Sequence, residues 1–308
     1  MLNIRRVLFP TDFSDFSKRA MSHAVKLAQD HRAELHMLHA IVLHEDDPHD
    51  PSHHFPDKSK IRELLEDLAM KRLDGLLRTS EIPDLVVTQV HRRGVSAAPP
   101  IVEYAREQDV DVIVMGTHGR RGVRKMIMGS VASEVVRYAP CAVMTVRGKG
   151  ETAPSHDLRR ILVPTDFSES AGYALSVACE VASLSGAKLD LVHVLPEILH
   201  PTFYTMGMTR IGGVGDGAFK GFESELGQLL DEAEGCLGVS AERHLLEGHP
   251  GREIVRFSRV SQGDLVVMAT HGLTGIKHFL LGSTAEQVLA GAECPVLILK
   301  ESGRPLLS

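Results

Sequence analysis

The sequence lacks three features that would place it in a familiar class of protein. No apolar run is longer than a β-strand, whereas about 20 apolar residues are needed to span a bilayer, so we expect no membrane partner. Its 34 Lys and Arg residues are outnumbered by 40 Asp and Glu residues, which gives a net charge of −6. Because nucleic-acid binding relies on basic side chains that neutralise phosphates, we expect no nucleic-acid partner.

Paired cysteines and a signal peptide are also absent. The four cysteines are widely spaced and form no CxxC pair, which favours small buried residues in a reducing compartment. The first residues, MLNIRRVLFPTDF, lack the long apolar core and small-residue cleavage site of a signal peptide. We therefore expect a cytoplasmic protein.

What the sequence does contain is an internal repeat. The segment FPTDFS returns as VPTDFS, so that Asp12 and Asp166 lie 154 positions apart (166 − 12). Gly129 and Gly282 lie 153 positions apart (282 − 129), so the alignment slips by a single residue. Such a long match indicates a duplication, and a length of 308 residues also suits two domains. We predict an N-terminal domain over 1–147, a linker over 148–158, a C-terminal domain over 159–303 and a tail over 304–308.

Each repeat alternates strand-like and helical patterns. The strand-like runs are RRVLF, ELHMLHAIV, LVVTQVH, DVDVIVM and AVMTV in the first repeat, and RRILV, KLDLVHVL, AERHLLE, GDLVVMA and PVLIL in the second. Helical spacing follows the first strand of each repeat, from Ser17 to about Asp30 and from Glu169 to about Leu184. The alternation predicts α/β domains, each with a five-stranded parallel sheet and helices on both faces. Ligands of such sheets bind outside the carboxyl ends of the strands, near the point where the strand order reverses.

A glycine-rich stretch, MGTHGRRGVRKMIMGSVASEVV, follows the fourth strand of the first repeat. Glycines let backbone N–H groups approach an anion, and Gly129-Ser130 opens a helix whose N-terminal N–H groups suit a phosphate. The alternative is that the glycines form a turn and Ser130 caps the helix.

Together these motifs resemble the universal stress protein family in its tandem two-domain form. They are PTDFS after the first strand, LHA or VHV in the second strand, and G-x2-G-x9-G-S before the last helix. The resemblance covers nearly the whole chain and implies two Rossmann-like domains with strand order 3-2-1-4-5. It also implies ATP held with Mg²⁺ at the strand ends, as in the nucleotide-binding branch of the family.

Site residues follow from the resemblance by position. Asp12 would accept from the adenine or ribose, Ala40 would offer its backbone to the adenine, and the residues of the glycine loop would cradle the phosphates. The expected nucleotide-binding residues of the first repeat are Pro10, Thr11, Asp12, Ala40, Gly116, Gly119, Gly129, Ser130 and Val131. Those of the second repeat are Thr165, Asp166, Val194, Gly272, Gly282, Ser283 and Thr284.

The second repeat departs from the glycine pattern at one position. Its motif begins with Ala269 where the first repeat has Gly116, and its loop carries Leu273 where the first has Arg120. In addition, Ser283 and Glu286 fit a capping box that would serve the helix itself. We expect the N-terminal site to bind ATP more tightly than the C-terminal site.

Several motifs have a second interpretation. Asp12 and Asp166 are also typical of a turn that caps the following helix. The run HEDDPHDPSHHF, with four histidines, is either a zinc site or a polar loop. His118 and His271 in the glycine loops would serve as general bases or merely shape the loop.

Three functions remain open from the sequence. The first is a regulatory ATP-binding protein with no catalytic residues, whose occupancy changes its shape or its protein partner under stress. The second is a slow ATPase; HxGH and SGGxDS are absent, so nucleotidyl transfer and pyrophosphatase chemistry are not indicated. The third is a nucleotide-free interaction protein. In each case we expect the last strands, Ala142–Val146 and Val296–Leu299, to pair within the chain, because bare apolar edges favour aggregation, with a homodimer as a further alternative.

Overall fold

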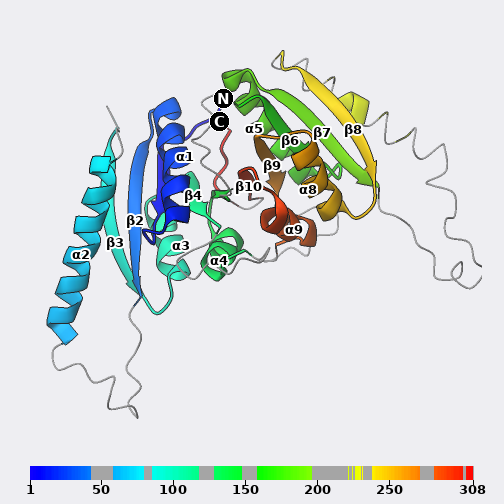
Figure 1. Cartoon of the computed structure of the whole chain (residues 1–308). Coiled ribbons are helices and arrows are strands. Elements are labelled where there is room, and N and C mark those ends of the chain that lie inside the picture. Colours follow the sequence, from blue (N-terminus) through cyan, green and yellow to red (C-terminus); the bar gives the residue numbers. More distant parts are fainter. Residues whose placement is uncertain are drawn as a thin grey trace, which may run out of the picture. The chain divides into compact units, whose positions relative to one another are not determined.

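The computed structural model describes residues 1–42, 58–79, 85–117, 128–147, 158–195, 221, 224, 226–229, 231, 238–270, 281–300 and 303–307. They belong to two compact units (Figure 1). The N-terminal unit comprises Asn3–Pro154 and Ser302–Ser308, and the C-terminal unit comprises Ser155–Glu301 and Met1–Leu2. The domain boundaries predicted from the sequence stay a prediction, because residues 148–157 lie outside the described part of the chain.

The N-terminal unit alternates strands and helices as predicted. Its elements are β1 (Arg6–Pro10), α1 (Asp15–His31), β2 (Glu34–Val42), α2 (Lys58–Thr79), β3 (Val87–Gly94), α3 (Ala98–Glu107), β4 (Val112–Gly116), α4 (Ser130–Tyr138) and β5 (Ala142–Val146). The strands are parallel in the order β3-β2-β1-β4-β5, which confirms the predicted order.

The C-terminal unit repeats this topology. Its elements are β6 (Arg160–Pro164), α5 (Glu169–Ser185), β7 (Lys188–Leu195), β8 (Ala241–Glu247), α8 (Pro250–Val260), β9 (Leu265–Ala269), α9 (Ser283–Gly291) and β10 (Val296–Leu299). The parallel order is β8-β7-β6-β9-β10, the same order as in the first repeat. Between β7 and β8 most residues lie outside the described part, although residues 226–229 are helical.

The core of each unit is formed by its central strands. Val7, Leu8 and Phe9 of β1 are fully buried, as are Ile113 and Val114 of β4. Covering both faces of these strands requires the continuous apolar runs seen in the sequence. Burial of apolar surface, at about 25 cal/mol per Å², is therefore the main source of stability for both sheets.

The cysteines that the structure describes form no disulfide, in agreement with the sequence. Cys141 and Cys179 are buried, and burial raises the pKa of the Cys294 thiol to about 12. Cys236 lies outside the described residues.

Strand order locates the edge at which parallel α/β sheets commonly bind ligands. In the N-terminal sheet β2 and then β3 lie on one side of β1, whereas β4 and then β5 lie on its other side. Right-handed crossovers therefore place α1 and α2 on one face of the sheet and α3 and α4 on the other. The carboxyl ends of β1 and β4 flank the point at which the order reverses.

The chain ends are tied into the units by polar contacts. In the N-terminal unit Asn3 N donates to Leu306 O at 2.8 Å, and Arg304 N donates to Pro140 O at 2.9 Å. The Arg304 Nε atom also lies 2.7 Å from Asp111 Oδ1, whose side chain is 2% exposed. Residues 303–307 thus contribute to the unit built mainly from the first repeat. No helix among the described residues is both long and apolar enough to cross a membrane.

Candidate functional site

The candidate site of the N-terminal unit lies at the carboxyl ends of β1 and β4. Pro10 is the last residue of β1 and Gly116 the last residue of β4. Thr11 and Asp12 follow β1 directly, Ala40 lies in β2, and Gly129 precedes Ser130 and Val131 at the start of α4. The C-terminal unit places its predicted residues in the same way, with Thr165 and Asp166 after β6, Val194 in β7, and Gly282, Ser283 and Thr284 at the start of α9.

The Thr-Asp-Phe-Ser segment after β1 forms a hydrogen-bonded turn. Thr11 Oγ1 accepts from Phe13 N at 3.0 Å, and Asp12 Oδ1 accepts from Ser14 N at 3.0 Å and from Ser14 Oγ at 2.6 Å. Ser14 is the N-cap of α1, and its Oγ accepts from Ser17 N at 3.3 Å. Asp12 is therefore confirmed as a turn residue, while the helix cap itself is Ser14. The role of Asp12 toward a ligand stays a prediction.

The second repeat builds the same turn from the same residue types. Asp166 Oδ1 accepts from Ser168 N at 3.2 Å and from Ser168 Oγ at 2.6 Å. Ser168 in turn is the N-cap of α5 and accepts from Ala171 N at 3.2 Å. The repeated motif thus reproduces a specific backbone conformation at the same edge of each sheet.

A phenylalanine in an unusual backbone conformation completes each turn. Phe13 and Phe167 both have φ 64°, in the left-handed region that non-glycine residues rarely adopt. Their rings pack against His39 and His193, with centroid distances of 4.5 Å and 4.6 Å. This packing, together with the Asp and Thr hydrogen bonds, stabilises the conformation.

The same histidines hold the backbone of the turn. His39 Nδ1 lies 2.7 Å from Thr11 O, and His193 Nδ1 lies 2.8 Å from Thr165 O. A carbonyl oxygen only accepts, so Nδ1 carries the proton in both rings. Sequence reasoning missed a site role for these histidines and for the phenylalanines. The signal for that role is their recurrence with the PTDFS motif in both repeats.

Gly116 brings β4 close to the first turn of α1. A Cβ atom at this position would lie 3.0 Å from the carbonyl oxygen of Phe16. The backbone of Gly116 is not left-handed, so the close approach to α1 is the feature that favours glycine at this position. At the equivalent position of the second repeat Ala269 ends β9, which shows that this edge accommodates a methyl group there.

The last helix of each unit begins at a glycine. Gly129 N donates to Thr117 O at 2.8 Å, and Gly282 N donates to Thr270 O at 2.9 Å. These bonds hold both glycines extended (ψ 148° and 145°), so each is the N-cap and makes no side-chain capping bond. Ser130 and Ser283 are each the first residue of their helix and so cannot be its N-cap. The predicted capping box at Ser283 is therefore wrong, and so is the interpretation of Ser130 as a cap. Sequence reasoning missed Thr117 and Thr270, which are buried. Their carbonyl oxygens hold the end of each strand against Gly129 and Gly282 respectively.

Part of the predicted site lies outside the described residues. This holds for Gly119 and Gly272, for His118 and His271, and for Arg120 and Leu273. The histidines of residues 44–54 also lie there, so the zinc interpretation of that run stays a prediction.

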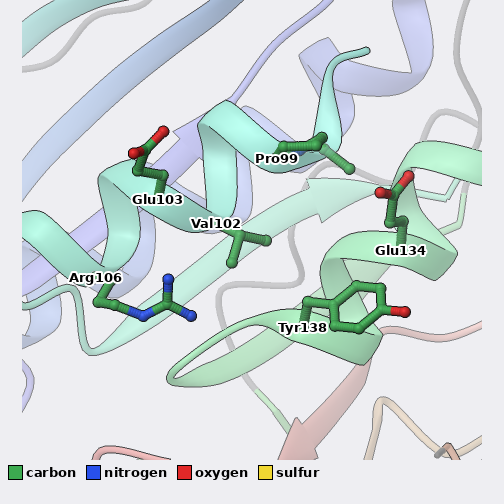
Figure 2. Close-up of a pocket in the computed structure, with 7 residues that line it drawn as sticks. Pro99, Val102, Glu103, Arg106, Glu134 and Tyr138 are labelled. Carbon is green, nitrogen blue, oxygen red and sulfur yellow. The ribbon is translucent and has the colours of Figure 1, made fainter. Parts of the chain in front are cut away.

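A groove of about 330 Å³ is present elsewhere in the N-terminal unit, between α3 and α4 (Figure 2). Ala98, Val102, Glu134 and Tyr138 are among the residues that line it. It contains none of the predicted nucleotide-binding residues, so we do not assign it to the candidate site.

The corresponding helices of the C-terminal unit pack more closely. A Cβ atom at Gly251 would lie 2.6 Å from Gln287 Oε1, and one at Gly291 would lie 2.8 Å from Val255 Cγ2. Ala98 and Tyr138 occupy the positions of these two glycines in the first repeat, so larger side chains separate α3 from α4.

Comparison with known proteins supports the duplication and the fold. The model of the Universal stress protein family matches residues 3–147 and, again, 157–300. A universal stress protein of Mycobacterium tuberculosis is 30% identical over 207 residues, which cover 66% of this chain and 66% of the relative. The match thus spans a little under two thirds of that relative's length.

Some similar proteins match about half of the chain and others match nearly all of it. A universal stress protein of Methanocaldococcus jannaschii is 30% identical over 155 residues, covering 46% of this chain and 94% of the relative. The crystal structure of a universal stress protein from Archaeoglobus fulgidus has a TM-score of 0.69 at 20% identity, and the match covers 96% of both chains. At that identity the structural similarity supports the fold alone.

Proposed function

Because the chain belongs to the universal stress protein family, we propose that it is an ATP-binding stress-response protein that acts as a nucleotide-dependent regulator. ATP would bind with Mg²⁺ at the carboxyl ends of the strands. We further propose that the N-terminal site binds more tightly than the C-terminal site.

The observation that carries this proposal is the start of α4. Gly129 is an N-cap without a side-chain hydrogen bond, and it lies directly beside the end of β4 through its bond to Thr117 O. The N-terminal N–H groups of a helix and its positive dipole end suit a phosphate group. Ser130, which is exposed at the first helical position, adds a hydroxyl group that can donate to the same anion.

The remaining predicted residues fit a nucleoside on the other side of this edge. Asp12, held by Ser14, lies after β1, and Ala40 lies in the neighbouring strand β2, two residues beyond the Pro10–Leu38 pair. A carboxylate accepts from ribose hydroxyl or adenine amino groups, and a backbone amide both donates and accepts. Mg²⁺ would be held mainly by phosphate oxygens and water, as this ion commonly is in nucleotide sites.

The difference between the two sites rests on Gly116 and Ala269. Gly116 lets β4 approach the first turn of α1 closely, because a methyl group there would meet Phe16 O at 3.0 Å. Ala269 fills the equivalent position with a methyl group. The arginines of the first glycine loop, absent from the second, would add to the attraction for phosphates.

Matched substitutions at the helix starts test this proposal. Ser130→Asp and Ser283→Asp each place a carboxylate at an exposed position in the first turn of the helix. The helix dipole stabilises a negative charge there, so the helix is kept, but the carboxylate repels a phosphate group. We expect equilibrium dialysis of the full chain with Mg²⁺-ATP to show loss of the tighter site in Ser130→Asp and of the weaker site in Ser283→Asp. ATP binding that is unchanged in both variants would reject the location proposed here.

The apolar last strands support a second element of the proposal, their pairing within one chain. β5 is the last strand of the N-terminal sheet order and β10 the last strand of the C-terminal order, and both are almost wholly apolar. Edge strands of this kind need a partner to avoid aggregation. We also propose a cytoplasmic location and a protein partner that responds to ATP occupancy, with a homodimer of chains as a further form of assembly.

A further inference from the structure

Three side chains that can bind a metal converge on the outer strands of the C-terminal unit. Asp190 lies in β7 opposite Glu242 of β8, and His244 follows two residues later on the same face of β8. His244 Nε2 lies 2.9 Å from Asp190 Oδ1 and 4.0 Å from Glu242 Oε2. One potential ligand atom from each residue lies within 4.8 Å of the other two.

Asp190 is an unusual member of this group because it is entirely buried. Its side chain has an exposed fraction of 0%, and its Oδ2 atom accepts no hydrogen bond from the described residues. Arg160 Nε lies 3.3 Å from Oδ2 and supplies positive charge without hydrogen-bond geometry. Buried carboxylate oxygens normally have hydrogen-bond or metal partners, so Oδ2 retains bonding capacity, while Oδ1 of the same carboxylate faces His244.

We propose that Asp190, Glu242 and His244 bind a divalent transition-metal ion of the Zn²⁺ class. The set of one imidazole nitrogen and two carboxylate oxygens suits zinc, whose bonds to these atoms are about 2.0–2.2 Å long. Tetrahedral ligands at that radius are about 3.4 Å apart, a value between the two observed distances of 2.9 Å and 4.0 Å. Water completes the coordination on the open side, because Glu242 is 50% exposed and His244 is 24% exposed.

Metal binding changes the hydrogen bonding of the cluster in a defined way. An imidazole nitrogen binds a metal through its lone pair, so Nε2 of His244 gives up the proton that bridges it to Asp190, and the neutral ring then carries its one proton on Nδ1. Lys188 forms an ion pair with Glu242 and therefore competes with the metal for this carboxylate. Affinity should rise when that competitor is removed.

The N-terminal unit lacks this set and acts as an internal control. His36 occupies the position of Asp190, and its Nδ1 lies 2.7 Å from Tyr104 Oη. Thr88 lies opposite it in β3, and Val90 lies opposite Leu38. The cluster is also separate from the nucleotide edge, because Asp190 lies near the amino end of β7 whereas nucleotide would bind at the carboxyl ends.

The experiment uses the full chain with His44, His49, His53 and His54 replaced by Ala, so that the histidine-rich segment cannot supply a metal site. Co²⁺ is titrated into the chelator-treated protein, and visible absorption reports tetrahedral coordination; Zn²⁺ then competes for the same site. We expect one ion per chain. Glu242→Gln and His244→Gln should weaken binding at least about tenfold, and Lys188→Gln should tighten it.

Asp190→Asn provides a further variant that keeps the shape of the buried side chain and should also lose binding. Because Glu242 and His244 are partly exposed, their variants test the site even where Asp190→Asn lowers stability. Absence of saturable Co²⁺ uptake, or uptake that is equal in the parent protein, Glu242→Gln and His244→Gln, would overturn the proposal.

Discussion

The Nδ1 atom of His39 donates to the carbonyl oxygen of Thr11 across 2.7 Å, so a side chain of β2 holds the turn that follows β1. The ring of the same histidine packs against Phe13, the residue with a left-handed backbone. His39 therefore fixes the backbone on both sides of Asp12. The second repeat makes the same arrangement with His193, which indicates that the position of this aspartate depends on the histidine.

Replacing His39 tests that dependence. We expect His39→Ala to lower the free energy of unfolding by about 2 kcal/mol, because it removes a hydrogen bond and an aromatic contact, and to weaken ATP binding at the N-terminal site. Urea denaturation and nucleotide titration measure the two effects. His91→Ala is the control, since His91 is 32% exposed and lies 3.7 Å from Glu66; a change within about 0.5 kcal/mol is expected. Equal losses in the two variants would contradict a specific role for His39.

Asp111 and Asp264 allow a matched comparison of the two units. Asp111 Oδ2 accepts from Arg5 N at 2.7 Å and Arg6 N at 2.9 Å, while its Oδ1 meets Arg304. Asp264 accepts from two backbone N–H groups in the same way.

Loss of the Asp111 carboxylate leaves two backbone donors and one arginine without their partner, so Asp111→Ala should cost about 3 kcal/mol of stability. Asp264→Ala should cost about 1–2 kcal/mol. Chemical denaturation of the two variants gives both values, and a larger loss for Asp264→Ala would argue against the contribution of Arg304.

His36 predicts a pH dependence of stability. Burial is the main cause that lowers the pKa of His36 in the folded protein, and Glu34 partly opposes it. As the pH falls, His36 is therefore protonated in the unfolded chain before it is protonated in the folded protein. The contribution of neutral His36 to folding stability is fully present above the unfolded pKa of about 6.5 and is lost as the pH falls below that value.

Comparison with His36→Asn isolates this effect, because an amide has no such titration and can keep a hydrogen bond to Tyr104. We expect the parent protein to lose stability more steeply than the variant below pH 6.5, by no more than about 1.4 kcal/mol per pH unit. Urea midpoints between about pH 5 and 8 measure the difference. Parallel curves would show that His36 does not titrate differently on folding.

Gly116→Ala tests the proposed ranking of the nucleotide sites. The added methyl group would press on Phe16 O at 3.0 Å and displace α1 from β4. We expect ATP affinity at the N-terminal site to fall about tenfold, or roughly 1.4 kcal/mol, when measured in the Ser283→Asp background. The reciprocal Ala269→Gly, in the Ser130→Asp background, should not weaken the other site. Unchanged affinity in Gly116→Ala would remove the reason for ranking the sites.

Several parts of the fold could be predicted because they depend on local pattern. Continuous apolar runs such as DVDVIVM identify a strand covered on both faces, and β4 is buried accordingly. The turn of Asp12 was also recognisable as an alternative, since Asp and Ser at this spacing bond to nearby backbone.

Other parts depend on contacts that no local pattern reveals. The N-cap of α9 is Gly282 and not Ser283, because Thr270 O accepts from Gly282 N and holds the chain extended for one more residue. Likewise, Arg304 contacts Asp111 nearly two hundred residues away, and polar surface residues carry no periodic signal for such a partner. The positive φ of Phe13 was missed for the same reason, since it depends on His39 in another strand.

The most direct test of nucleotide binding is isothermal titration of the nucleotide-stripped full chain with ATP and Mg²⁺, which gives stoichiometry as well as affinity. We predict two unequal sites, or one site per chain, with the tighter site lost in Ser130→Asp. Absence of heat together with absence of bound nucleotide would contradict the proposal and would leave the glycine loops with an architectural role only.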